Sequence, residues 1–315
     1  MKFTKMEGLG NDYIYVDGAR EVIPYDKKPE IVRRLSDRHF GIGGDGVIFI
    51  NPNPRGDFEM EMWNADGTRS EMCGNGMRCV GKYVHDMGLT DKTELAIESG
   101  GKMKYLTLTL KDGQVESVCV DMGEAGLAPE VIPADLGKAN PEGAAQATVT
   151  PVEGIGVQTT EGQPANASQV AVISQPITVD GKMYEMTLVN MGNPHAVVFY
   201  DGIDDMDIEA IGPKFENHPC FPQRTNTEFI EVIDRTHVKM RVWERGTGET
   251  LACGTGACAV GVACMLNEKT EDHVTVSLLG GDLDIRWDRA KNRVYKTGPA
   301  KFVFQGEVEL PELNA

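Results

Sequence analysis

The stretch that decides the fold is Met240-Arg241-Val242-Trp243-Glu244, running on to Cys253-Gly254-Thr255-Gly256, because the chain contains it twice. The upstream copy is Met60-Glu61-Met62-Trp63-Asn64, running on to Cys73-Gly74-Asn75-Gly76, and it aligns without gaps at a constant offset of 180 residues. A register shift of two residues also places Gly10-Asn11 over Gly192-Asn193. An internal repeat of this length indicates two homologous halves.

Each half has the same order of predicted elements: strands, a Cys-Gly-x-Gly turn, and an apolar helix. The helix over 255–266 carries no charge and should be buried all round, whereas its counterpart over 76–87 has its apolar residues on one side. Strands are predicted at 58–63, 95–99, 104–110, 115–120, 184–190, 196–200, 227–233, 237–243 and 274–278. The pattern predicts an α/β (α+β) fold of two pseudo-symmetric domains, each a curved, mostly antiparallel sheet or barrel around a central hydrophobic helix.

A length of 315 residues is typical of two cores of about 150 residues each. We place the N-terminal domain, which carries Cys73, at 1–122 plus about 295–315, and the C-terminal domain, which carries Cys253, at 123–294. Amphipathic outer helices are expected at 29–39 and 207–217. The region from about 127 to 169 is expected to be a surface excursion without chemistry. Residues 293–310 are strand-like and are expected to return to the first domain's sheet.

The formal net charge of -17 argues against nucleic acid and anionic membranes as partners, because both require a basic patch. The N-terminus has no apolar signal segment, and no stretch reaches the roughly 20 apolar residues that a membrane span requires. We therefore expect a cytoplasmic protein that takes a small-molecule amino-acid substrate and has no nucleic-acid or membrane partner. Whether it forms a homodimer is left open.

The seven cysteines do not indicate a disulfide framework, since their number is odd and no secretory signal precedes them. Their spacing matches no zinc-ligand pattern, so no metal is expected. Cys73 and Cys253 differ from the rest because each stands directly before Gly-x-Gly at a predicted helix N-terminus. There, unpaired backbone N–H groups and the helix dipole favour a thiolate or a bound carboxylate. The other five are expected to be small apolar residues: Cys79, Cys119, Cys220, Cys258 and Cys264.

Two such thiols suit one reaction, the removal of the α proton of an amino acid and its return on the opposite face. Inversion requires one acid-base group on each face, and a duplicated chain supplies one thiol from each half. The helix ends would also stabilise negative charge that develops in the transition state. We therefore predict a racemase or epimerase that needs no cofactor, with Cys73 and Cys253 as its acid and base. A non-catalytic amino-acid-binding protein is the alternative from another class.

Three further motifs have competing interpretations. The run Gly41-Ile42-Gly43-Gly44-Asp45-Gly46 matches the dinucleotide fingerprint formally, but it leads into a strand-like segment, so a tight turn is expected. His195 could serve a cysteine hydrolase, but that would leave the duplicated cysteine unexplained. Glu244-Arg245 is either a surface ion pair or a site in which Arg245 binds a carboxylate and Glu244 binds an ammonium group or tunes a thiol.

At these residues the sequence resembles the diaminopimelate epimerase family over nearly the whole chain. Enzymes of this family interconvert LL- and meso-diaminopimelate in bacterial lysine and cell-wall synthesis without a cofactor. The resemblance rests on Gly8-Leu9-Gly10-Asn11-Asp12, Asn64-Ala65-Asp66-Gly67, Met72-Cys73-Gly74-Asn75-Gly76 with Arg78-Cys79, Gly192-Asn193-Pro194-His195, Thr225-Asn226 with Glu228-Phe229, Glu244-Arg245-Gly246 with Gly248-Glu249-Thr250, and Ala252-Cys253-Gly254-Thr255-Gly256-Ala257-Cys258.

The resemblance implies that Cys73 and Cys253 are the acid-base pair. It implies that the carboxylate at the reacting centre binds to Gly74, Asn75, Gly254 and Thr255. The amino group and the distal groups would be held by Asn11, Asn64, Asn193, Asn226, Glu244 and Arg245, and the thiols would be tuned by His195 and Glu244. Racemases of other amino acids share the fold and stay open as alternatives, whereas isomerases of the phenazine pathway lack the cysteine pair. Which cysteine deprotonates which stereoisomer is left open.

The chain departs from the family's pattern at two places. Gly46 occupies a position where some members carry glutamine, so one substrate contact is either absent or supplied by another group. The connection over 127–169 is also longer than the family's usual one.

Overall fold

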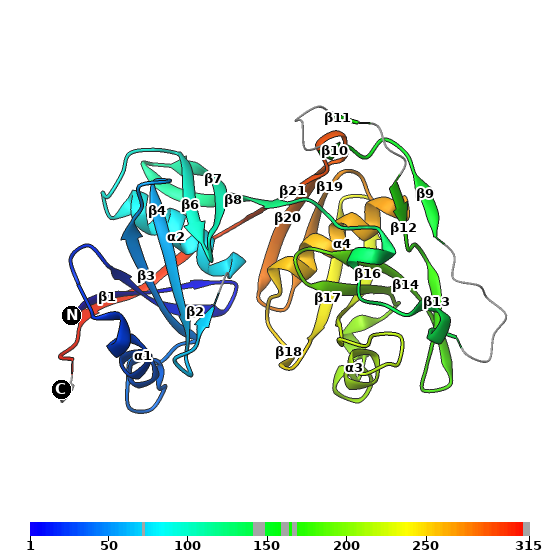
Figure 1. Ribbon diagram of the computed structural model, residues 1–315, viewed down its shortest axis with the longest axis horizontal. Coiled ribbons are helices and arrows are strands. Elements are labelled where there is room, and N and C mark those ends of the chain that lie inside the picture. The colour runs from blue at the N-terminus through cyan, green and yellow to red at the C-terminus, as the bar shows by residue number, and fades with distance from the viewer. Residues whose placement is uncertain (71–72, 141–148, 159–163, 166–168, 311–315) are drawn as a thin grey trace. The chain divides into compact units, whose positions relative to one another are not determined.

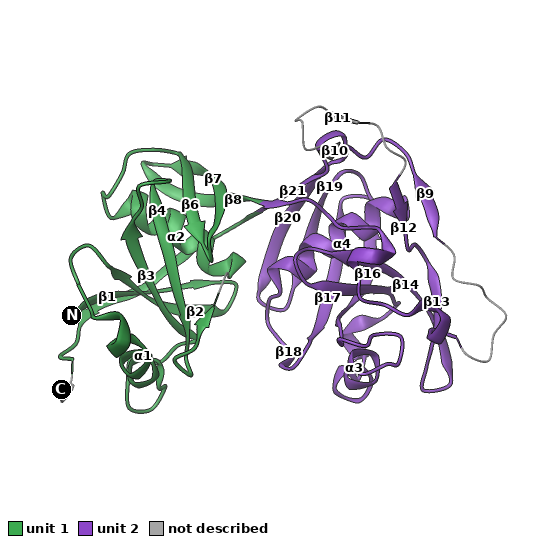
Figure 2. Ribbon diagram, in the orientation of Figure 1, with its two compact units in different colours: residues 1–121, 297–315 green, residues 122–296 purple. Residues whose placement is uncertain are grey.

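The computed structural model describes residues 1–70, 73–140, 149–158, 164–165 and 169–310 (Figure 1). It divides into two compact units: unit 1 contains residues 1–121 and 297–315, and unit 2 contains residues 122–296 (Figure 2). These bounds lie within two residues of the predicted domains. Cys73 belongs to unit 1 and Cys253 to unit 2.

Unit 1 is a sheet with one central and one outer helix. Its elements are β1 (Lys2–Gly8), β2 (Asn11–Asp17), α1 (Lys28–Ser36), β3 (Gly46–Pro52), β4 (Phe58–Asn64), β5 (Arg69–Ser70), α2 (Gly74–Asp86), β6 (Glu94–Ser99), β7 (Lys102–Lys111), β8 (Gln114–Gly123) and β22 (Lys301–Glu307). β2 pairs parallel with β3 and β4 with β6, while β1–β2, β3–β4, β4–β5, β6–β7 and β7–β8 are antiparallel. β22 pairs antiparallel with β1, so the later part of the C-terminal stretch completes this sheet as predicted, whereas residues 293–296 belong to unit 2.

Unit 2 repeats this design. Its elements are β13 (Gln175–Val179), β14 (Lys182–Asn190), β15 (Pro194–Phe199), α3 (Ile208–Glu216), β16 (Asn226–Asp234), β17 (His237–Glu244), β18 (Gly248–Glu249), α4 (Gly254–Leu266), β19 (His273–Leu278), β20 (Gly281–Asp288) and β21 (Arg293–Gly298). β15 pairs parallel with β16 and β17 with β19, while β13–β14, β14–β15, β16–β17, β17–β18 and β19–β20 are antiparallel. From β14 to β20 the directions match those from β1 to β7, so the sequence repeat is a repeat of topology.

The central helices are buried against their own sheets. In α4 every residue from Gly256 to Met265 is buried, as its uncharged sequence predicts. α2 is buried from Asn75 to Val84, which is more than its one-sided pattern predicts, because it also takes charged side chains inside. Two matched glycines allow the close approach: a Cβ at Gly81 would lie 2.9 Å from a methyl group of Leu106, and one at Gly261 would lie 2.5 Å from a methyl group of Ile285.

The outer helices α1 and α3 lie at the predicted positions and pack on the two hydrophobic cores. In α3 the Asp207 side chain accepts from the Ala210 N–H, which is the usual reason for a helix to begin after aspartate. α1 buries Ile31, Val32 and Leu35 in unit 1. The glycine run before β3 is a turn that leads into a strand, so the dinucleotide interpretation is excluded by its context.

The connection over 127–169 is not wholly a surface excursion. Ile132 and Ala139 are buried in the core of unit 2, which corrects the expectation for its first part. The connection contains only short elements. They are 3-10 turns at Pro129–Val131 and Leu136–Lys138, and the strands β9 (Thr150–Val152), β10 (Val157–Gln158), β11 (Pro164–Ala165) and β12 (Gln169–Ala171). Residues 141–148, 159–163 and 166–168 of this connection lie outside the described residues, as does Met72 of the first cysteine motif.

Candidate active site

Both candidate catalytic residues occupy the same local position. Cys73 is the N-cap residue of α2 and Cys253 is that of α4, each with extended backbone (φ -128°, ψ 116° and φ -108°, ψ 106°). The first N–H groups of a helix have no acceptor within it, and the positive end of the helix dipole lies there. Each thiol is therefore next to a turn that attracts anions. That turn contains the residues predicted to bind the carboxylate, Gly74 and Asn75 in α2 and Gly254 and Thr255 in α4.

The Cys73 thiol is half-buried and both accepts and donates a hydrogen bond. Its sulfur accepts from the Gly76 N–H at 3.3 Å and donates to Asn11 Oδ1 at 3.0 Å. The chain thus joins one predicted substrate-binding residue directly to a predicted catalytic residue. The bond from the helix N–H is of the kind that stabilises a thiolate.

A chain of charged groups orients Asn11. Its Nδ2 donates to Asp45 Oδ2 at 2.6 Å, and Arg38 forms ion pairs with Asp45 at 2.9 Å and with Asp12 at 2.7 Å. Lys5 pairs with Asp12 at 2.6 Å. Burial raises the pKa of Asp12, but hydrogen bonds from Arg38 and Lys5 outweigh it and hold this pKa below its usual value. Because Nδ2 is bonded to Asp45, Asn11 presents its acceptor oxygen to the thiol.

The other two predicted residues of unit 1 are held by short-range bonds. Asn75 is buried, and its Oδ1 accepts from Arg78 Nη1 at 3.0 Å within the first turns of α2. Asn64 ends β4, and its Nδ2 donates to Thr68 Oγ1 at 3.1 Å across a turn. Both are therefore fixed by groups near them in sequence.

Cys253 has a more enclosed environment than Cys73. It is only 5% exposed, and its sulfur lies 3.6 Å from Thr255 Oγ1. Burial is the main cause that raises the pKa of Cys253 well above its usual value, and the negative charges of Glu244 and Glu228 add to it. Thr255 and the Gly256 N–H oppose the rise. The protonated thiol is thus the stable form, suited to serve as an acid.

A buried pair lies beside Cys253. His195 Nδ1 is 2.7 Å from Glu228 Oε1, and both side chains are fully buried. His195 Nε2 is 2.9 Å from Asn193 Oδ1. Burial raises the pKa of Glu228, although His195 acts in the opposite direction. Two of the predicted residues, Asn193 and His195, are thus bonded to each other. His195 is also bonded to the carboxyl group of Glu228, which was not predicted.

The remaining predicted residues of unit 2 cluster at the ends of β16 and β17. Asn226 Nδ2 donates to the Pro194 carbonyl at 3.0 Å, and its Oδ1 accepts from the Arg245 N–H at 2.9 Å. The Arg245 guanidinium donates to the Gln223 carbonyl at 3.0 Å. Glu244 accepts from the Thr250 hydroxyl at 2.5 Å.

Sequence reasoning missed two residues next to the thiols. Glu228 is one, and Tyr13 is the other: burial, and then negative charge on Cys73 and Asp45, raises the pKa of Tyr13. Each lies two residues along a strand from a residue that was predicted, Glu228 from Asn226 and Tyr13 from Asn11. Alternation in a strand places such residues on one face, which is the signal that could have found them.

The departure at Gly46 has a steric explanation. A Cβ at this position would lie 2.0 Å from the Trp63 carbonyl oxygen and 2.9 Å from the ring of Tyr13. In this backbone conformation only glycine fits. The glutamine of other family members therefore has no counterpart at this position of the chain.

All seven cysteines are free thiols. Burial raises the pKa of Cys79, Cys220 and Cys264 to about 12 each, which leaves them inert at neutral pH. Cys258 is also buried, while Cys119 is half-buried. These environments agree with the prediction of apolar packing roles, except that Cys119 is less enclosed than expected.

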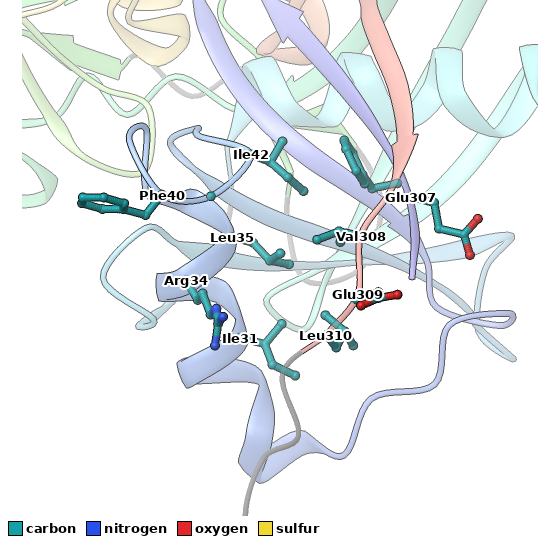
Figure 3. Close-up of a pocket in the computed structure, with 11 residues that line it drawn as sticks. Ile31, Arg34, Leu35, Phe40, Ile42, Glu307, Val308, Glu309 and Leu310 are labelled. Atoms are coloured by element: carbon teal, nitrogen blue, oxygen red, sulfur yellow. The ribbon is translucent and has the colours of Figure 1, made fainter.

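A pocket of unit 1 lies away from these residues (Figure 3). It is lined by α1, the 40–42 loop and the segment from the end of β22 to Leu310, and its apolar residues include Ile31, Leu35 and Phe40. It contains none of the predicted site residues. Within the described ranges, no group of three or more His, Cys, Asp or Glu side chains could hold a metal ion. None of the described helices is long and apolar enough to cross a membrane.

Solved structures with the same architecture define the class of protein. A Bacillus anthracis phenazine biosynthesis protein of the PhzF family has a TM-score of 0.63 at 15% identity, covering 98% of both chains. A hydroxyproline epimerase from Agrobacterium vitis has a TM-score of 0.61 at 13% identity, covering 100% of this chain and 92% of the other. The chain therefore has the α/β fold shared by PhzF proteins and proline racemase-like epimerases, as predicted.

Sequence comparison narrows the class to a family. The diaminopimelate epimerase model matches residues 3–128 and 187–303, leaving out most of the long connection. A diaminopimelate epimerase of Acetivibrio thermocellus is 50% identical over 313 residues, covering 99% of this chain and 100% of that protein. One from Desulfovibrio desulfuricans is 50% identical over 307 residues, covering 98% of each. The chain belongs to the diaminopimelate epimerase family, and it is an isomerase.

Proposed function

We propose that the chain interconverts LL- and meso-2,6-diaminopimelate with Cys73 and Cys253 as a two-thiol acid-base pair. The observation that carries the proposal is the matched placement of one thiol per unit at the N-cap of each central helix. The family relationship supports the substrate and a place in lysine and peptidoglycan synthesis. The proposal includes a cytoplasmic location, and it requires no cofactor and no nucleic-acid or membrane partner.

Epimerisation requires an acid and a base on opposite faces of the α carbon. One cysteine, as the thiolate, takes the α proton, and the other, as the thiol, returns a proton to the opposite face. At the end of the reaction the two cysteines have exchanged protonation states, so the reverse reaction uses them in opposite roles. Proton transfer between thiols and substrate needs no electron acceptor.

The helix ends serve the carboxylate at the reacting carbon. Backbone N–H groups around Gly74 and Asn75, and around Gly254 and Thr255, would bind it and the negative charge that develops on it. The amino group and the distal amino-acid centre would be held by Asn11, Asn64, Asn193, Asn226, Glu244 and Arg245. In this proposal His195 and Glu244 act on the thiols, which the charge of Glu244 near Cys253 supports.

The test is proton NMR of LL-diaminopimelate with purified protein in D2O and reductant, without pyridoxal phosphate or added metal. We expect deuterium to enter one α position as meso product appears, and conversion to be lost in Cys73→Ala and in Cys253→Ala. Wild-type turnover that survives alkylation of both thiols would contradict the mechanism. Exchange with another amino acid instead would make the chain a racemase of that substrate, and exchange with none would favour a binding protein.

A further inference from the structure

A buried carboxyl group packs under the first turn of α4, next to Cys253. A Cβ at Gly256 would lie 2.7 Å from Glu228 Oε1 and 3.2 Å from the Cys253 sulfur, so these two atoms crowd the same point. Glu228 is fully buried. Among the described residues its second oxygen, Oε2, has no hydrogen-bond partner. A buried oxygen without a partner costs stability, so the fold alone gives no reason for this carboxyl group.

The matched position in unit 1 also indicates that the fold does not require a carboxyl group here. At the offset of the repeat, Glu228 corresponds to Ile48, which occupies the same register position: Ile48 lies opposite Tyr15 and Met62, and Glu228 lies opposite Val197 and Val242. A Cβ at Gly76 would lie 2.8 Å from the Ile48 side chain, as one at Gly256 would meet Glu228. This architecture therefore accepts isoleucine at a position where unit 2 has glutamate.

The hydrogen bonds fix where the protons are. Asn193 Oδ1 is an acceptor only, so His195 Nε2, at 2.9 Å, must carry a proton. The 2.7 Å contact between His195 Nδ1 and Glu228 Oε1 then requires a second proton between these two atoms. Whichever atom holds it, the pair has no net charge. Asn193 accepts with its oxygen and is left to present its NH2 group as a donor.

The charge of this pair also affects the ionisation of the Cys253 thiol. Two carboxyl groups act on Cys253, Glu228 from β16 and Glu244 from β17, and His195 from β15 is bonded to Glu228. Burial raises the pKa of Glu228, which favours keeping the proton in the pair. In a net-neutral pair the proton shared with His195 balances the charge of Glu228, so Glu244 is the uncompensated carboxylate that opposes ionisation of Cys253.

We propose that Glu228 is a positioning residue: its shared proton holds His195 as the Nε2–H donor, turns the Asn193 NH2 group outward, and keeps net negative charge away from Cys253. The inference rests on the proposed two-thiol function for its consequence in turnover. The relay from Glu228 through His195 to Asn193 stands on the geometry of unit 2 alone. An amide NH2 group presented in this way suits a carboxylate of the substrate.

Two variants separate the relay from simple packing. Glu228→Gln keeps a donor for His195 Nδ1 but cannot ionise, whereas Glu228→Ile copies unit 1 and removes the donor. We expect kcat/KM of Glu228→Gln within about threefold of wild type at neutral pH, and that of Glu228→Ile about tenfold or more lower, as for the loss of an oriented polar contact. We expect Glu228→Ile to stay folded with little change in its unfolding temperature, because removal of the unpaired Oε2 offsets the loss of the partner of His195 Nδ1.

Two readouts do not depend on turnover. ¹⁵N NMR of histidine-labelled protein, with His195 assigned from a His195→Gln sample, should show an Nε2–H imidazole in wild type and Glu228→Gln and a mixture of tautomers in Glu228→Ile. The pH dependence of Cys253 alkylation should be the same in Glu228→Gln as in wild type, because the pair with His195 carries no net charge in either protein. A Glu228→Ile protein with wild-type activity and tautomer would overturn the proposal, as would a tenfold loss of activity in folded Glu228→Gln. Failure of the two-thiol function would instead appear as turnover by Cys253→Ala.

Discussion

Units 1 and 2 have the same strand order and the same helix position but different groups around their thiols. Cys73 is half-buried and bonded to Asn11, which an exposed ion network orients through Asp45 and Arg38. Cys253 is buried, and the Glu228 carboxyl group that is bonded to His195 lies next to it. The comparison teaches that duplication copied the backbone that places a thiol at a helix N-terminus, while the side chains that control each thiol diverged.

The largest expected effect tests whether two unlike thiols are equally necessary. Cys73→Ala and Cys253→Ala should each lower kcat for epimerisation by about a thousandfold or more, because inversion needs a group on both faces. The measurement is product formation by NMR or chiral chromatography, with circular dichroism as the folding control. Cys79→Ala is the matched control and should keep wild-type kcat. An alanine variant of either N-cap cysteine that retained the full rate would break the comparison.

The matched glycines sharpen the comparison by steric substitution. Gly76→Ala forces a methyl group against Ile48, whereas Gly256→Ala forces one between Glu228 and the Cys253 sulfur. Overpacking should lower the free energy of unfolding by about 1–3 kcal/mol in both, measured in urea. Only Gly256→Ala places the methyl group against a carboxyl oxygen, so it should lose more kcat than Gly76→Ala. Equal losses of kcat would show that the two environments do not differ in function.

The reactivity of the thiols should differ in the free protein. Because the pKa of Cys253 lies well above its usual value, little of it is thiolate at neutral pH, and each unit of pKa lowers that fraction about tenfold. Cys73 should therefore react with iodoacetamide at least about tenfold faster at pH 7.5. Peptide mass spectrometry over time gives both rates from one sample. Faster modification of Cys253 would contradict the asymmetry.

The smallest effect concerns the acid side. The pKa of Asp12 lies below its usual value of 3.8 in the folded protein, so its contribution is present above that value and is lost as pH falls through the folded pKa. Wild type should lose about 1 kcal/mol more free energy of unfolding between pH 5 and pH 3 than Asp12→Asn does. The matched position in unit 2 is Pro194, which does not titrate. If wild type and Asp12→Asn lost stability equally on acidification, the ion pairs of Asp12 would not contribute to the difference between the two units.

Most elements could be predicted from the sequence because their signals are local. The uncharged run of α4, the N-cap aspartate of α3 and the alternation of β4 and β17 each lie within a few residues. The expectation failed for α2, where Arg78 and Lys82 are buried, because the sequence does not show that partners such as the Pro299 carbonyl and Asp86 satisfy them. It also failed for Ile132 and Ala139, since buried residues in an irregular segment have no periodicity to reveal them.

The sequence by itself determined that the chain is a duplication with one thiol at the start of each central helix, because a Cys-Gly-x-Gly turn and its helix are contiguous. It also carried the motifs that identify the family. Only the tertiary structure decided which side chains control each thiol, because parallel pairing of β15 with β16 brings together residues 33 positions apart, His195 and Glu228. Burial depends on the tertiary packing and cannot be read from the sequence. It raises the pKa of Cys253 and makes the two copies of one motif chemically different.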